Sequence, residues 1–131
     1  MDIRFSAAAS GDVVVVMAGD GAVLTPAGEA LDKAANGRLT KAMAAMRFTG
    51  AAGQVADILA PEGLEFARVL VIGLGKLEIA DGLAVERWAG HAVKRTLTTA
   101  EKLVLQPDAL PGVSKADAGA HAALGARLAS Y

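Results

Sequence analysis

The stretch RVLVIGLGK, residues Arg68 to Lys76, decides the fold class of this chain. Its five residues from Val69 to Gly73 are apolar without alternation, and three of them are β-branched. A strand that is apolar on both faces is typical of the middle of a sheet that is covered on both sides, so the run predicts a parallel α/β core. The run ends in Gly73-Leu74-Gly75-Lys76, a turn at the carboxyl edge, where ligands usually bind in open α/β folds.

Composition places the chain among ordinary single domains. It has 131 residues, of which 53% are hydrophobic and only 4% aromatic, so the core must be built from aliphatic side chains and alanine. The formal charge of −1 gives no overall attraction to nucleic acid or to anionic membranes. The chain has no cysteine, which excludes disulfides, thiolate metal sites and cysteine nucleophiles and fits a reducing cytosol.

No apolar run is long enough for a transmembrane helix, for which ~20 residues are needed. The apolar stretch Val13–Met17 is too short, and too weakly preceded by positive charge, for a signal peptide. We therefore expect a cytoplasmic domain without membrane contact.

Around the deciding stretch, the pattern predicts a series of alternating strands and helices. Strands are expected at Ile3–Phe5, Val13–Met17, Val55–Leu59 and Lys102–Leu105, and helices from Pro26 to about Ala35, and over Leu39–Met46, Leu83–Leu97 and Lys115–Tyr131. Thr25 and Asp81 are the expected N-caps of the first and third helices, and Asn36-Gly37 the end of the first. The apolar face of the third helix should comprise Val85, Trp88, Ala89, Ala92, Val93 and Leu97.

This order predicts one mixed sheet with helices on both faces. Because Ser10-Gly11-Asp12 reads as a turn, the first two strands are expected to be antiparallel. The glycine-bearing loops Gly19–Leu24 and Gly73–Gly82 could meet at the carboxyl edge, as in the ligand cleft of macro domains, which bind ADP-ribose.

The glycine-rich turn does not fit a nucleotide fingerprint. A dinucleotide motif needs a third glycine where Glu78 stands. A P-loop needs glycine at the position of Leu70 and Ser or Thr at the position of Leu77. The turn is therefore interpreted as structural.

No residue pattern points to catalysis or to metal binding. His91 and His121 lack companions at metal-ligand spacing and are expected at the surface. None of the serines lies in a nucleophile elbow; they are Ser6, Ser10, Ser114 and Ser130. The carboxylates near loops follow no spacing that is diagnostic of a catalytic pair; they are Glu62, Glu65, Glu78 and Asp81. We expect no catalytic, cofactor-binding or metal-ligating residue in this chain.

One helix face carries a cluster of positive charge. Arg87, His91, Lys94 and Arg95 share it at helical spacing and could contact phosphates. The neutral overall charge and the lack of interleaved aromatic residues favour an ordinary solvated face.

Four segments together resemble the N-terminal domain of the leucyl (cytosol) aminopeptidase family. They are FTGAAGQ at Phe48–Gln54, RVLVIGLGK at Arg68–Lys76, ERWAGHAVKRTL at Glu86–Leu97 with KLVLQP at Lys102–Pro107, and the alanine-rich end at Ala129-Ser130-Tyr131. The resemblance implies a macro-domain-like three-layer α/β sandwich that spans residues 1–131 as one accessory domain.

The resemblance also implies a function for the parent protein. The family comprises hexameric exopeptidases that remove N-terminal residues with two divalent metal ions, Zn or Mn. Its metal ligands lie in a C-terminal domain around the motif N-T-D-A-E-G-R-L, which this chain lacks. The implied role is a non-catalytic domain for assembly and active-site access, inactive alone, with its own catalytic domain as partner. A macro-like module for ADP-ribose-type ligands and a DNA-contacting module are the alternatives.

Overall fold

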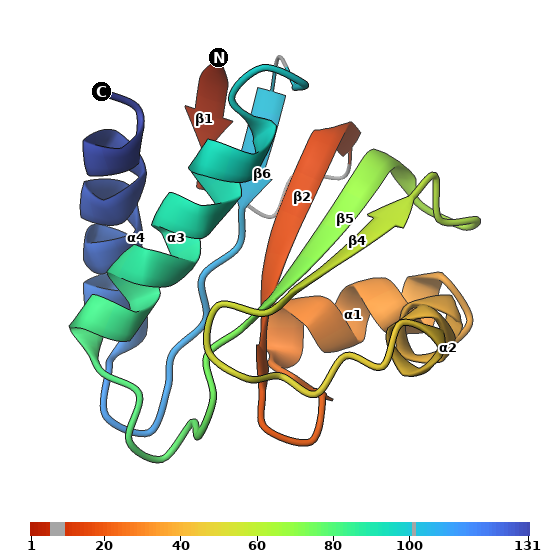
Figure 1. The fold of residues 1–131 in the computed structure, drawn as a ribbon, viewed down its shortest axis with the longest axis horizontal. Coiled ribbons are helices and arrows are strands. Elements are labelled where there is room, and N and C mark those ends of the chain that lie inside the picture. The colour runs from red at the N-terminus through yellow and green to blue at the C-terminus, as the bar shows by residue number, and fades with distance from the viewer. Residues whose placement is uncertain (6–9, 101) are drawn as a thin grey trace.

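A computed structural model of the chain describes residues 1–5, 10–100 and 102–131. In that part, one sheet is covered by helices on both faces (Figure 1). The strands are β1 (Asp2–Arg4), β2 (Ser10–Gly19), β3 (Val23–Leu24), β4 (Val55–Leu59), β5 (Glu65–Gly73) and β6 (Lys102–Leu105). The helices are α1 (Pro26–Ala34), α2 (Arg38–Ala45), α3 (Gly82–Thr96) and α4 (Lys115–Ala129).

The strand order in the sheet is β1-β6-β2-β5-β4, and β3 pairs with β2. The neighbours β1 and β6, β6 and β2, and β2 and β5 are parallel. Strand β4 runs antiparallel to β5, and β3 antiparallel to β2. The sheet is therefore mixed and mostly parallel, which confirms the predicted class.

Strand β5, which contains the deciding stretch, lies inside the sheet and has a hydrophobic core on each side. Val69 and Val71 belong to the cluster on the side of α2, whereas Leu70 and Ile72 belong to the cluster built with α3 and α4. All four are fully buried. Successive side chains point to opposite faces of a strand, and both faces are covered, so an uninterrupted apolar run is what this position requires.

Strand β2 follows the same rule beside β5. Val13, Val15 and Met17 face the α3 and α4 side, while Val14 and Val16 face the other side. The strand is longer than predicted, because Ser10 and Gly11 already pair with Glu65 and Phe66 of β5.

The predicted antiparallel pairing of the first two strands is wrong. Strand β6 lies between β1 and β2, and both are parallel to it. The segment Ser10-Gly11-Asp12 is not a turn but the start of β2. The Asp12 side chain accepts a hydrogen bond from the backbone N–H of Lys102 at 3.0 Å, which ties β2 to β6 instead.

The helix ends follow the sequence signals, with two corrections. Asp81 caps α3 as predicted, because its side chain accepts from the N–H of Ala84 at 3.0 Å. Thr25 occupies the N-cap position of α1, but its side chain makes no capping bond there. Leu97, expected on the buried face of α3, is 47% exposed because the helix ends at Thr96.

Among the described residues, no helix is long and apolar enough to cross a membrane.

Candidate functional site

The turn after β5 is held by backbone contacts on both sides. The N–H of Leu74 donates to the carbonyl of Ala18 at 2.8 Å, and the N–H of Gly75 to that of Gly50 at 2.9 Å. A Cβ on Gly73 would overlap the carbonyl of Ala51, so only glycine fits this close approach. These contacts support the structural interpretation of the turn.

The two glycine-bearing loops do meet at the carboxyl edge of the sheet. The N–H of Asp20 donates to the carbonyl of Gly75 at 2.9 Å, and the side chain of Leu77 lies where a Cβ on Gly19 would project. The Phe48–Gly53 loop joins them, because the carbonyl of Thr49 accepts from the N–H of Gly21 at 2.9 Å and the carbonyl of Gly50 accepts from the N–H of Gly75 at 2.9 Å. The loops fill the space between them by direct packing, and a hollow of about 230 Å³ remains beside them.

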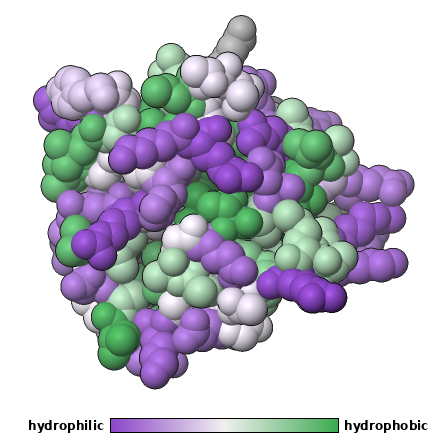
Figure 2. All heavy atoms as spheres, in the orientation of Figure 1, coloured by the Kyte–Doolittle hydropathy of each residue, from purple (hydrophilic) through white to green (hydrophobic). Residues whose placement is uncertain are grey.

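The basic face of α3 is smaller than the sequence predicted. Arg95 lies 3.5 Å from the carboxylate of Asp57, so its charge is partly neutralised. In the described part of the chain, Arg87, His91 and Lys94 have no ion-pair partner. They border a groove between α3 and α4 together with Leu128 and Tyr131. Figure 2 shows hydrophilic side chains crossing the face that α3 covers, with apolar side chains beside them over α4.

The two histidines differ in their surroundings. His91 is exposed, as predicted, and its ring lies 3.3 Å from the place where a Cβ on Gly53 would stand. His121 is not a free surface residue, because its Nδ1 lies 2.8 Å from Glu86 Oε2. Its ring also occupies the space above Gly82, so it joins α4 to α3.

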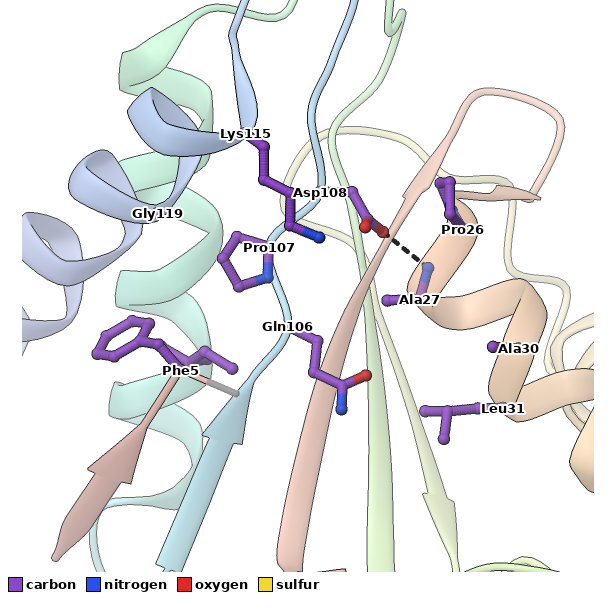
Figure 3. A pocket seen from close by; sticks show the side chains of 11 residues that line it. Phe5, Pro26, Ala27, Ala30, Leu31, Gln106, Pro107, Asp108, Lys115 and Gly119 are labelled. Atoms are coloured by element: carbon purple, nitrogen blue, oxygen red, sulfur yellow. Dashed lines mark hydrogen bonds between the residues drawn. The ribbon is translucent and has the colours of Figure 1, made fainter. Parts of the chain in front are cut away.

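A larger hollow lies elsewhere on the carboxyl edge, between the start of α1 and the connection from β6 to α4 (Figure 3). Its volume is about 580 Å³, within the roughly 300–1,000 Å³ that small-molecule sites span. Ala27, Ala30, Leu31 and Pro107 supply apolar walls. Gln106, Asp108 and Lys115 add polar groups to the same hollow.

Asp108 is the most constrained of these polar groups. It is only 6% exposed, and its Oδ2 accepts from the Thr25 hydroxyl at 2.7 Å and from the N–H of Ala27 at 2.9 Å. The carboxylate thus takes the place of an N-cap at α1, where negative charge is favoured by the helix dipole. It explains why the Thr25 side chain does not cap its own helix.

Metal binding has no candidate in the described residues, where no group of three or more His, Asp or Glu side chains is placed to hold an ion.

Comparison with known proteins agrees with the fold and covers nearly all of the chain. Residues 13–131 match the model of the "Cytosol aminopeptidase family, N-terminal domain". The chain belongs to this family. The N-terminal-domain segments that carry the resemblance in the sequence all lie inside the matched range.

Relatives of this cytosol aminopeptidase domain are much longer proteins. A probable cytosol aminopeptidase of Caulobacter vibrioides is 42% identical over 119 residues, which cover 90% of this chain and 23% of the relative. A probable cytosol aminopeptidase of Rhodopseudomonas palustris is 36% identical over 130 residues, which cover 98% of this chain and 26% of the relative. The chain therefore spans about a quarter of the length of these relatives.

Solved structures show the same domain fold. A mutant of tomato leucine aminopeptidase matches with a TM-score of 0.73 at 20% identity, over 100% of this chain and 28% of that one. The bottromycin maturation enzyme BotP matches with a TM-score of 0.65 at 25% identity, over 93% of this chain and 24% of the BotP chain.

The hollow between the start of α1 and the connection from β6 to α4, which we call the Asp108 pocket, was not predicted from the sequence of this family member. Asp108 follows Pro107 in a stretch that has the composition of a loop, and its two partners lie 83 and 81 residues away. The helix start at Thr25-Pro26 gave no signal of it, because Thr25 has the sequence of an ordinary N-cap and only the structure shows that its side chain makes no capping bond.

Proposed function

We propose that this chain is the non-catalytic N-terminal domain of a metal-dependent leucyl aminopeptidase, and that it contributes to assembly and to active-site access. The whole protein would remove N-terminal amino acids from peptides. In this proposal the two divalent metal ions, Zn or Mn, bind in a separate catalytic domain, and the parent is a homohexamer.

One observation carries the proposal: the match to the family's N-terminal domain over residues 13–131, in relatives about four times as long that are named as aminopeptidases. A structure of BotP in complex with Mn shows that a protein with a domain of this fold can bind this metal.

The test is an activity assay of the 131-residue chain with leucine p-nitroanilide and added Mn²⁺ or Zn²⁺. No turnover is expected, because the reaction is assigned to the catalytic domain. The matched control is the longer relative of Caulobacter vibrioides, of which this chain covers 23% and which should hydrolyse the substrate. Metal-dependent turnover by the purified 131-residue chain would contradict the proposal.

A second candidate is contact with DNA through α3. The observation in its favour is the positive charge of Arg87 and Lys94 on one groove, since neither has an ion-pair partner among the residues that the structure describes. A gel shift at low salt should be lost when Arg87, Lys94 and Arg95 are changed to alanine. Changing Lys33 and Lys41, exposed on α1 and α2, is the control for charge loss on another face. Equal retention in both variants would count against the α3 face.

A further inference from the structure

The Asp108 pocket lies at a topological switch point of the sheet. Strands β2 and β6 are adjacent and parallel. After β2 the chain passes to α1 on one face of the sheet, and after β6 it passes to α4 on the other (Figure 1). The carboxyl ends of such strands leave a crevice, which is where ligands bind in open α/β sheets.

Asp108 presents one carboxylate oxygen to this crevice. Both of its hydrogen bonds go to Oδ2, and among the described residues Oδ1 accepts none. No buried side-chain oxygen or nitrogen in the described part of the chain lacks a partner, so Oδ1 must be open to the pocket that Asp108 lines. A ligand with a positively charged donor would complete the coordination of this oxygen.

Lys115 supplies the opposite charge from the other wall. It is the first residue of α4, and its side chain extends toward Asp108 and Pro107 (Figure 3). In the described structure it forms no ion pair, including with Asp108, so the two charges face one pocket without meeting. A cation in the first turn of a helix opposes the helix dipole, and a ligand carboxylate there would relieve this.

The remaining walls restrict the ligand further. Ala27, Ala30, Leu31 and Pro107 offer apolar surface for an aliphatic group. The N-terminus of a helix is a common phosphate-binding site in proteins. At the N-terminus of α1, however, the Asp108 carboxylate already accepts the hydrogen bond of the Ala27 N–H. A phosphate at that wall would be repelled, so the pocket does not suit a nucleotide bound through α1.

We propose that this pocket binds a free apolar α-amino acid, with its ammonium group on Asp108 Oδ1, its carboxylate on Lys115 Nζ and its side chain against α1. A small zwitterion satisfies both charges at once while burying an apolar group. The proposal rests on the pocket alone: leucine binding and the activity assay above can each fail without the other.

The test is titration of the 131-residue chain with leucine, followed by backbone amide NMR. Signals of Ala27, Gln106 and Gly119 should shift with saturation. Isoamylamine lacks the carboxylate and 4-methylpentanoate lacks the ammonium group, so each should bind at least about tenfold more weakly, equivalent to about 1.4 kcal/mol. Absence of leucine-induced shifts at these residues, or equal binding of either analogue, would overturn the proposal.

Two variants locate the site without disturbing the fold. Gly119→Leu should abolish binding, because a Cβ at Gly119 meets nothing within 4 Å and the side chain would fill the pocket that this residue lines. Ala120→Leu, on an exposed position of the same helix, is the matched control and should bind normally. Lys115→Met should weaken leucine binding about tenfold and leave isoamylamine unaffected. Leucine binding retained by Gly119→Leu would place the site elsewhere.

Discussion

The hydroxyl of Thr25 donates a hydrogen bond of 2.7 Å to Oδ2 of Asp108, across 83 residues of sequence. The bond joins the start of α1 to the segment that follows β6, and the N–H of Ala27 reaches the same oxygen at 2.9 Å. A carboxylate that is buried in this way stabilises the domain only while both donors remain paired with it. Asp108 therefore links the two faces of the sheet at the edge where the pocket that it lines is found.

Asp108→Ala should lower the free energy of unfolding by about 1–3 kcal/mol, the cost of leaving a buried donor unsatisfied. The Thr25 hydroxyl can turn to the carbonyl of Met17, which is 3.3 Å away, so the loss falls mainly on the N–H of Ala27. Asp108→Asn should cost less, since its amide oxygen can still accept. Urea denaturation followed by circular dichroism measures the change.

Asp20→Ala is the control for this prediction. Asp20 is an exposed loop residue. Its backbone N–H donates to the carbonyl of Gly75, and this bond does not depend on the side chain. Its substitution should stay within about 0.5 kcal/mol of the parent chain. Equal losses for Asp20→Ala and Asp108→Ala would show that net charge, and not the buried bonds, sets the effect.

The architecture could be predicted because it depends on local pattern. Val69–Gly73 is apolar on both faces because helices cover both faces of the sheet. The place of β1 could not be predicted, because its pairing joins Asp2 to Lys102 across almost the whole chain. A strand of three residues carries too little pattern to specify its neighbour.

The pocket escaped prediction for a related reason. Asp108 obtains its role from Thr25 and Ala27, which are remote in sequence, so no spacing rule brings the three together. By contrast, the Asp81 cap could be predicted because its partner Ala84 lies three residues on.

Trp88→Ala should cost about 3–5 kcal/mol of unfolding free energy, because it opens a cavity in the core between the sheet and α3. Trp88 is 1% exposed, and its indole N–H donates to the carbonyl of Val16 at 3.1 Å. Trp88→Phe keeps most of the packing and should cost less. Trp88 is the only tryptophan, so the variants are followed by circular dichroism rather than fluorescence.

Arg87→Ala, at the exposed neighbouring position, is the control and should change the stability little. A melting temperature that Trp88→Ala leaves unaffected would contradict the burial of Trp88 in the core.

Arg68 and Asp57 should show an energetic coupling of about 1 kcal/mol in a double-mutant cycle of Arg68→Met and Asp57→Asn, the upper end for ion pairs near the surface. The pair is bidentate, with bonds of 3.2 Å from Nε and 2.7 Å from Nη2, and its side chains are 17% and 19% exposed. A coupling near zero would mean that the geometry contributes nothing.

The same pair has a defined behaviour at alkaline pH. The hydrogen bond to Asp57, opposed by partial burial and aided by the Asp57 charge, raises the pKa of Arg68. A raised pKa in the folded state means that the contribution is complete below the ordinary arginine pKa and is lost only above it. The coupling energy between Arg68 and Asp57 should therefore be the same at neutral and at moderately alkaline pH. A decline between these pH values would contradict the raised pKa of Arg68.

Two glycines of α4 should respond in opposite directions to the same substitution. Gly119→Ala should raise the free energy of unfolding by about 0.5–1 kcal/mol, because alanine is the better helix former and the new Cβ meets nothing within 4 Å. Gly125→Ala should lower it by about 1–3 kcal/mol, because its Cβ would overlap the backbone carbonyl of Glu86 and push α4 away from α3. Each variant is the control for the other, since helix, residue type and added atom are the same. Thermal unfolding followed at 222 nm, the usual helix wavelength, measures both, and shifts of equal sign would show that α3 and α4 do not approach each other as closely as Gly125 requires.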